Sequence, residues 1–242
     1  MDWWLVCCNI HKYDHLLTFI LITLGIFFVI AAIYFLILSK KTKEVISKLH
    51  LYRTDSYESN VIMIFQQKYS VQVQIVAVTR PLAFTYGFIR PRILISTGLM
   101  NILQPDELKA VLEHEYYHYQ NKDPVKVSLW FSLARVFSFL PISQKLYERY
   151  MIEKEIKADT FAINQVGMKA VASALYKLIT NMPSSSYATV HFQNHSFQDT
   201  NIRIEVLLTG TYKRPSISRL EWIKSIILVL FIALLIGCLS IL

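Results

Sequence analysis

Two long uncharged segments constrain this chain more than any other feature of its sequence. Residues 16–38 form an apolar run of 23 residues without a charged side chain. At about 1.5 Å per residue, a helix over this run can cross a hydrocarbon core roughly 30 Å thick. Residues 225–242 form a second uncharged run, which follows Trp222 and Lys224, two residue types that favour the membrane interface. We therefore expect transmembrane helices over 16–38 and 222–242, with the lipid bilayer as a partner.

The composition agrees with membrane residence. The chain is 54% hydrophobic and has a mean hydropathy of +0.37, which is too apolar for an ordinary soluble domain. The first run is longer than the apolar core of a typical signal peptide, and no small-residue cleavage site follows it. We therefore expect a retained helix at 16–38 rather than a cleaved leader.

Basic residues flank the inner ends of both runs and predict the orientation. The first 15 residues contain only Lys12 among Lys and Arg, whereas the segments next to the two runs are basic. These basic residues are Lys40, Lys41, Lys43, Lys48 and Arg53 after the first run, and Lys213, Arg214, Arg219 and Lys224 before the second. The positive-inside rule then predicts a short extracytoplasmic N-terminus over 1–15 and a cytoplasmic domain over 39–221, in a bacterial cell membrane.

The net charge of +8 comes mainly from these juxtamembrane residues. Such a distribution favours anionic lipid headgroups, and no basic stripe with interleaved aromatic residues predicts nucleic-acid binding. The three cysteines form no disulfide framework: Cys7 and Cys8 precede the first run and Cys238 lies within the second. The vicinal pair leaves lipidation and metal ligation open as alternatives.

The segment between the runs predicts an α+β fold, mainly helical, with a small β-hairpin or sheet. Hydrophobic periodicity and breaker residues predict helices over 43–67, 104–121, 143–166 and 202–209, a strand over 71–78 and a hairpin over 83–96. Asp123 and Pro124 predict the start of a further helix, and 183–200 reads as a loop. The apolar stretch 127–140 is too short to span and contains Arg135, so we expect a buried or interfacial segment.

The helix at 104–121 contains the sequence His114-Glu115-Tyr116-Tyr117-His118. Residues four apart share one face of a helix, so both imidazoles can bind one ion, and Glu115 can reach a water on that ion. Two His ligands and a Glu base are typical of zinc peptidases, with Zn²⁺ as the cofactor. The alternative is a surface helix whose His and Glu side chains are solvated.

A catalytic zinc needs a third protein ligand, and the helix at 143–166 offers Glu155 and Asp159. These carboxylates are four residues apart on one face and repel each other unless a positive charge lies beside them. We expect Glu155 to bind the metal and Asp159 to hold the outer N–H of a ligand His. The rival ligand is Glu153, and the alternative to a site is a solvated acidic patch.

These residues together resemble the cytoplasmic peptidase domain of the BlaR/MecR-type β-lactam sensor-transducers. The resemblance is carried by 112–118, by Lys122-Asp123-Pro124, by Glu155 to Asp159 with Ala162, by the hairpin over 81–99 and by 201–204. It covers about residues 70 to 220. HtpX-type and CAAX-protease gluzincins are similar in the HExxH and Glu-x-x-x-Asp sequences but differ around the hairpin.

The resemblance implies a zincin-type metallopeptidase that hydrolyses peptide bonds. In this mechanism His114, His118 and Glu155 hold Zn²⁺, and Glu115 takes a proton from the attacking water and passes it to the leaving amine. The strand near 83–87 would hold an extended substrate. Arg203 is a candidate contact to the transition state on the resemblance alone, with a surface or lipid-facing Arg as the alternative.

Two loop histidines, His191 and His195, either face the site or are solvated; we expect solvated side chains. The chain also departs from the sensor-transducers, which carry several spans before the peptidase domain and a penicillin-binding domain outside the cell. We therefore do not expect β-lactam sensing.

Three functions fit the sequence. The first is a regulatory membrane endopeptidase that cleaves a cytoplasmic or membrane-proximal protein, such as a transcriptional repressor, in signal transduction. The second is an HtpX-like quality-control or peptide-processing protease with the same site residues. The third is a non-catalytic signalling or immunity protein with a zinc site, against which Glu115 argues, because a structural zinc needs no base. Dimerisation through the membrane helices is compatible with each function.

Overall fold

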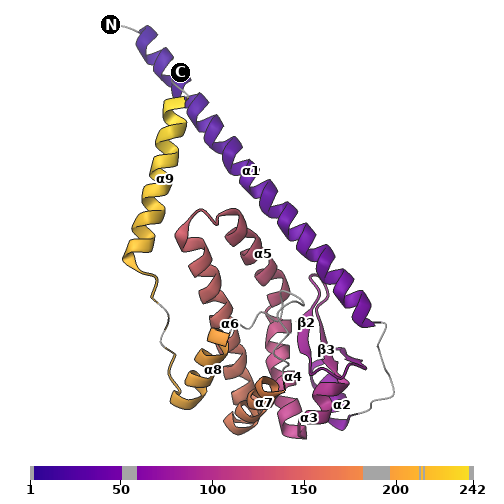
Figure 1. Cartoon of the computed structure of the whole chain (residues 1–242). Coiled ribbons are helices and arrows are strands. Elements are labelled where there is room, and N and C mark those ends of the chain that lie inside the picture. Colours follow the sequence, from indigo (N-terminus) through magenta and orange to yellow (C-terminus); the bar gives the residue numbers. More distant parts are fainter. Residues whose placement is uncertain (1–2, 51–58, 182–196, 213, 215, 240–242) are drawn as a thin grey trace. The chain divides into compact units, whose positions relative to one another are not determined.

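The computed structural model describes residues 3–50, 59–181, 197–212, 214 and 216–239. The helices are α1 (Trp3–His50), α2 (Asn60–Tyr69), α3 (Thr97–Ile102), α4 (Pro105–Gln120), α5 (Asp123–Val136), α6 (Pro141–Val166), α7 (Met168–Thr180), α8 (Phe197–Thr209) and α9 (Arg219–Leu239). The strands are β1 (Val73–Val76), β2 (Ala83–Tyr86) and β3 (Arg92–Ser96). The predicted fold class, mainly helical with a small sheet, is confirmed (Figure 1).

The chain divides into two compact units. The first consists of Met1–Ile37, Leu129–Glu148 and Pro215–Leu242. The second consists of Leu38–Ser128 and Arg149–Arg214, and it contains the sheet and the helices that carry the predicted site. Because α5 and α6 are continuous helices, each begins in one unit and ends in the other.

The sheet of the second unit has the strand order β1-β3-β2. Strands β2 and β3 are antiparallel with Ala83 opposite Ile95, so the predicted hairpin is confirmed. Strand β1 pairs with β3 in parallel, with Val73 opposite Ile93, which the hairpin sequence alone did not predict. The central strand is the most buried: Ile93, Leu94 and Ile95 are fully inaccessible.

Both faces of the sheet are covered, which explains the apolar run in β3. Ile93 and Ile95 pack with α2 and α4 side chains such as Phe65 and Leu112. Leu94 packs on the other face with Val76, Phe84 and Tyr86, and Ile46 from the last turns of α1 packs against this cluster. The β3 side chains thus alternate between two apolar layers, as a central strand requires.

Helix α4 begins with a reciprocal capping arrangement. The backbone N–H of Gln104 donates to Oε2 of Glu107 at 2.6 Å, and Pro105 occupies the first turn, where its missing N–H is no loss. The Nζ of Lys177 on α7 also donates to Glu107 at 2.7 Å, and the Ser173 hydroxyl donates at 2.6 Å. Helix α7 is thereby held along the start of the helix that carries the two histidines.

Several sequence predictions need correction. The single helix predicted over 43–67 is wrong, because α1 ends at His50 and α2 begins at Asn60 after Ser59 in an extended conformation. Helices α3 and α7 were not predicted. Most of the predicted loop over 183–200 lies outside the described residues, but its last residues already belong to α8, which begins at Phe197. The boundaries of α4 and α6 agree with the prediction to within two residues.

The first unit contains the apolar part of α1. Within the described ranges, one segment, Ile20–Lys48, is long and apolar enough to cross a membrane. Helix α9 covers residues 222–239 of the second predicted span, and the last residues of that span, 240–242, lie outside the described residues. Along α1 the least exposed side chains recur every four residues, at Thr23, Phe27 and Ala31, and the remaining faces expose large apolar side chains.

Candidate metal centre

The two histidines of the HExxH sequence lie one turn apart on α4 and face the same point. The Nε2 atoms of His114 and His118 are 3.2 Å apart, and their ring centroids are separated by 4.8 Å. Two imidazole nitrogens that converge in this way cannot both donate to each other. A shared electrophile between them satisfies both lone pairs.

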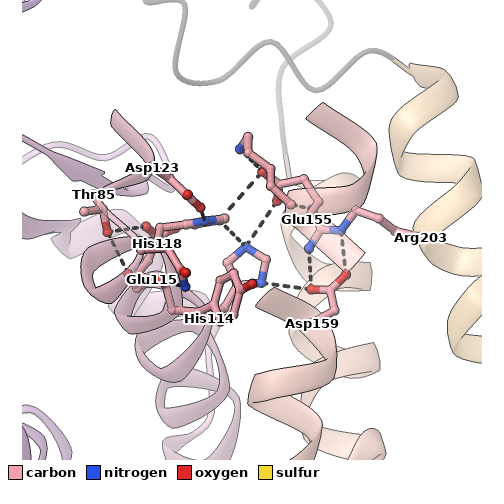
Figure 2. A network of polar contacts seen from close by, with 11 residues as sticks. Thr85, His114, Glu115, His118, Asp123, Glu155, Asp159 and Arg203 are labelled. Atoms are coloured by element: carbon pink, nitrogen blue, oxygen red, sulfur yellow. Dashed lines mark hydrogen bonds and ion pairs between the residues drawn. The ribbon is translucent and has the colours of Figure 1, made fainter. Parts of the chain in front are cut away.

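A carboxylate holds the outer nitrogen of each ring (Figure 2). The Nδ1 of His114 lies 2.9 Å from Oδ1 of Asp159 on α6, and the Nδ1 of His118 lies 2.6 Å from Oδ2 of Asp123. A carboxylate accepts a hydrogen bond from Nδ1–H, and this tautomer of the neutral ring directs the Nε2 lone pair into the site. Metal-binding histidines in proteins are generally held in this way.

Glu155 supplies the third candidate ligand. Its Oε2 lies 3.2 Å from Nε2 of His114, and its Oε1 lies 3.7 Å from Nε2 of His118. Ligand atoms of the three side chains all lie within 4.8 Å of one another, so they could hold one metal ion. Two atoms each about 2.1 Å from a tetrahedral ion lie about 3.4 Å apart, so the donor set and its spacing suit Zn²⁺.

Glu153, the rival ligand, points elsewhere. Its Oε1 accepts from Nε of Arg149 at 2.9 Å, and the guanidinium of Arg214 lies 3.8 Å away. A displacement of two residues along α6 turns its side chain away from α4, as expected for a helix. It therefore lies outside the His114, His118 and Glu155 cluster.

Glu115 is buried and is held by a strand residue. The hydroxyl of Thr85 on β2 lies 2.9 Å from Oε2 of Glu115 and 2.8 Å from its backbone carbonyl oxygen. Thr85 is itself buried, with 5% of its surface exposed. The contact joins the edge strand to the middle of α4, so the position of the Glu115 carboxylate depends on the sheet as well as on the helix.

Two cations lie among the carboxylates. Arg203 on α8 donates from Nε to Oδ2 of Asp159 at 2.7 Å and from Nη2 to Oδ1 at 2.8 Å, a bidentate pair. Its Nη1 lies 3.6 Å from Oε2 of Glu155. Lys154 forms an ion pair with Glu155, and only 11% of its side chain is exposed. Four buried carboxylates around the histidines are thus partly balanced by buried Arg203 and partly buried Lys154.

These contacts shift the acidities of the site. Burial lowers the pKa of His114, but hydrogen bonds to Asp159 and Glu155 outweigh burial and raise it to about 9. Burial raises the pKa of Asp159, but the Arg203 guanidinium and His114 hold that pKa well below its usual range. Asp159 is therefore ionised at neutral pH and favours a positive charge at His114, either a proton or a metal ion.

The cluster lies in a pocket of the second unit with two different walls. The polar wall is formed by His114, Glu115, His118, Asp123, Lys154, Glu155, Asp159, Thr200 and Arg203. The apolar wall comes largely from α4 and α7 and is formed by Ala110, Val111, Val171, Ala174, Leu175, Leu178 and Ile179. Residues 81 and 83–85, at the start of the edge strand, and Pro124 and Val127 of α5 complete the lining.

Sequence reasoning missed three residues of this pocket. Asp123 was expected only to begin a helix, although its position five residues after His118 was visible. Thr85 lies in the predicted hairpin, but no periodic signal relates a strand residue to Glu115. Lys154 precedes the predicted ligand Glu155, and the sequence analysis assigned no role to it. The loop residues His191 and His195 lie outside the described residues.

Comparison with known protein families assigns the chain to a family of peptidases. The sequence profile of peptidase family M48 matches residues 58–182, which include the HExxH sequence and the Glu155 to Asp159 segment. The chain belongs to peptidase family M48. The M48 segment is therefore of metallopeptidase type, and the histidine and glutamate cluster is where a metal ion could bind.

Two relatives agree with the M48 assignment. The chain is 24% identical over 204 residues to the regulatory protein BlaR1 of Staphylococcus aureus, covering 78% of this chain and 33% of BlaR1. It is 44% identical over 54 residues to a protease HtpX homologue of Thermoplasma acidophilum, covering 22% of this chain and 17% of the homologue. The chain thus spans a third or less of either relative. The resemblance to BlaR-type and HtpX-type proteins is confirmed.

Proposed function

We propose that this chain is a membrane-anchored zinc endopeptidase that cleaves a cytoplasmic or membrane-proximal protein. One observation carries the proposal: two imidazoles, each held at Nδ1 by a carboxylate, direct their Nε2 atoms toward Glu155, with Glu115 beside them. A solvated surface helix would not need Asp123 and Asp159 buried against these rings.

His114, His118 and Glu155 would hold the ion, and Asp123 and Asp159 would orient the two rings. When bound, Zn²⁺ supplies Lewis acidity, which lowers the pKa of a water in the site and polarises the scissile carbonyl. Two neutral imidazoles and one carboxylate would leave the ion and its ligands with a net positive charge, which suits the negative charge that develops on the carbonyl oxygen.

Glu115 is the general base and later the general acid. It removes the proton from the attacking water as the C–O bond forms, and delivers that proton to the amide nitrogen as the C–N bond breaks. The Thr85 hydroxyl holds one carboxylate oxygen of Glu115, which leaves the other for the water. We therefore assign Thr85 as a positioning residue for the base.

The pocket suits an extended peptide. Strand β2 is the last strand in the order β1-β3-β2, and its residues Ala83 to Thr85 line the pocket. A substrate strand can add to this edge, with main-chain hydrogen bonds for affinity and the apolar wall for one side chain. Lys154 and Arg203 both face the pocket, so either can stabilise the oxyanion; the contact from Arg203 stays a prediction.

We further propose two spans, 16–38 and 222–242, with the peptidase domain over 39–221 in the cytoplasm. The positive residues that flank the inner ends of both runs support this orientation. Under this topology residues 1–15 lie outside the cell. Dimerisation through the two membrane helices is compatible with it.

A regulatory role is our first choice for the biology. The long match to a relative named as a regulatory protein supports cleavage of a signalling protein such as a transcriptional repressor. The 44% match over 54 residues to an HtpX homologue supports the alternative, a quality-control or peptide-processing protease. The catalytic residues are the same in both, so the natural substrate alone distinguishes them.

The test is cleavage and bound zinc, measured together on detergent-purified full-length protein with fluorescein-labelled casein as the probe. Wild type should hold about one zinc per chain and cleave, and Glu115→Gln should keep the zinc and lose cleavage. Glu148→Gln makes the same chemical change at an exposed glutamate of α6 and is the matched control. If Glu115→Gln cleaves like wild type, Glu115 is not the general base. If wild type holds zinc but cleaves no more than Glu115→Gln, the protein is a zinc-stabilised signalling protein and the enzyme assignment fails.

A further inference from the structure

The tip of the hairpin formed by α5 and α6 belongs to the unit of the membrane helices, not to the unit of the metal centre. Residues Leu129–Glu148 cluster with Met1–Ile37 and Pro215–Leu242. This part of the chain is the apolar stretch that is too short to span a membrane by itself. Its contacts with α1 and α9 indicate that it enters the bilayer without crossing it.

Aromatic side chains join the hairpin tip to the middle of the first apolar run. The ring of Phe27 lies 5.5 Å from that of Phe137 and 5.6 Å from that of Phe139, centroid to centroid. Phe27 lies eleven residues from either end of the 16–38 run, so it sits near the bilayer midplane if that run spans. Residues in contact with Phe27 then lie at a similar depth.

A second contact joins the same hairpin to the other predicted span. The backbone N–H of Ile142, in the first turn of α6, donates to Oγ of Ser225 on α9 at 3.3 Å. Ser225 is buried, with 5% of its surface exposed, although it begins an apolar run. The hairpin tip therefore contacts both helices that carry the predicted spans.

The outer face of the tip exposes large apolar side chains. Leu129, Trp130 and Phe139 expose 49%, 39% and 39% of their surfaces. Single exposed apolar residues are ordinary, but three large ones within eleven residues of a hairpin that packs against α1 favour an apolar environment. Acyl chains of the lipid around α1 are the partner that would cover these exposed apolar side chains.

Charged residues mark where this surface ends. Lys126 on α5 is exposed, and so are Lys145 and Glu148 of α6, which form an ion pair at 3.3 Å. From Lys126 to the end of α5 at Val136 the helix rises about 15 Å, close to half the thickness of a hydrocarbon core. Arg135 is the charged residue inside this interval, and its guanidinium lies 5.3 Å from the ring of Phe131, one turn nearer to Lys126.

We infer that residues 129–143 form a re-entrant hairpin that enters one leaflet, the cytoplasmic one under the proposed topology, and packs its tip against α1. The inference rests on the proposed span at 16–38. Its partner is lipid: the apolar tip contacts acyl chains, and the Lys126 side chain lies at the level of the headgroups. The hairpin adds a third membrane contact to the two spans and does not cross the bilayer.

The test uses full-length protein with Cys7, Cys8 and Cys238 replaced by Ser and one new cysteine labelled with the fluorophore NBD. The labelled positions are Phe139→Cys at the tip, Phe28→Cys on the first span and Lys109→Cys on the exposed face of α4. The protein is reconstituted in phosphatidylcholine–phosphatidylglycerol vesicles that carry a nitroxide on the headgroup or at mid-chain. Thermal unfolding by circular dichroism shows that each variant folds like its parent.

The label at 139 should emit at shorter wavelength than the label at 109 and be quenched at least twofold more by mid-chain than by headgroup nitroxide. If the label at 28 is quenched from mid-chain but the label at 139 behaves like that at 109, the re-entrant hairpin is wrong and the span stands. If the labels at 28 and 139 both escape quenching, the span and the hairpin are wrong together. Neither outcome depends on whether the chain cleaves peptides.

Discussion

The Oδ2 of Asp123 lies 2.6 Å from Nδ1 of His118, although α4 ends between these two residues. The turn that joins them contains Lys122 with φ 51°, a left-handed conformation that is uncommon for a residue with a side chain. The reversal brings the first residue of α5 back against the last turn of α4. A helix start and a ring-orienting carboxylate are therefore provided by one residue.

Asp123→Asn should weaken zinc binding by about 10- to 100-fold, because the His118 ring loses the charged acceptor that orients it. Competition with a fluorescent chelator of known affinity measures the change. Asp106→Asn changes an exposed aspartate in the first turn of α4 and should leave the zinc affinity unchanged. Equal affinities for Asp123→Asn and wild type would contradict a ring-orienting role.

Arg203→Met should destabilise the protein by about 3–5 kcal/mol, because Asp159 and Glu155 would lose a buried counter-charge. Chemical denaturation of the zinc-free protein in detergent measures the free energy of unfolding without a contribution from the metal. Arg149→Met removes a partly exposed pair with Glu153 and should cost less than 1 kcal/mol. A similar, small loss in both variants would mean that the Asp159 pair is not held as the structure describes.

Zinc affinity should rise with pH between about 6.5 and 9. His114 has its pKa raised to about 9, so at neutral pH the zinc-free protein must release a proton when the metal binds. One released proton corresponds to roughly a tenfold gain in affinity per pH unit over this window. The same shift means that the zinc-free protein gains stability from His114 below pH 6.5 and loses it as pH rises through about 9.

Calorimetric titrations in two buffers of different protonation enthalpy count the released protons. About one proton per zinc at pH 7.5 is the expected value. An affinity that does not change between pH 6.5 and 9 would contradict the protonated state of His114.

Thr85→Val should lower kcat/KM by about 10- to 100-fold at unchanged zinc content, because a hydrogen bond to a charged group contributes roughly 1.5–3 kcal/mol. The loss should fall on kcat more than on KM, since Glu115 acts in the chemical step. Thr85→Ser keeps the hydroxyl and should restore most of the activity. If Ser and Val behave alike, the contact is structural.

Much of the site was predictable because helix periodicity is local. A spacing of four residues brings His114 to His118 and Glu155 to Asp159 whatever the rest of the fold does. The meeting of α4 and α6 was inferred from chemistry alone: two carboxylates on one helix face need a positive partner. The geometry brings these four side chains together as that argument expected.

The remaining features depend on contacts between distant segments, which no local pattern encodes. The parallel pairing of β1 with β3 joins Val73 to Ile93, twenty residues later, although β2 lies between the two strands in the chain. Thr85 meets Glu115 only because β2 is the edge strand over α4. Helix α7 was not predicted, although its buried residues Val171, Ala174 and Leu175 have helical spacing.

Metal analysis of Glu155→Ala beside Glu153→Ala tests the central claim most directly. The two glutamates are two residues apart on α6, yet one faces the histidines and the other pairs with Arg149. Mass spectrometric metal analysis of the purified proteins should find about one zinc per chain in wild type and in Glu153→Ala, and little zinc in Glu155→Ala. Zinc retained by Glu155→Ala and lost from Glu153→Ala, or absent from wild type after reconstitution, would contradict the proposed metal centre.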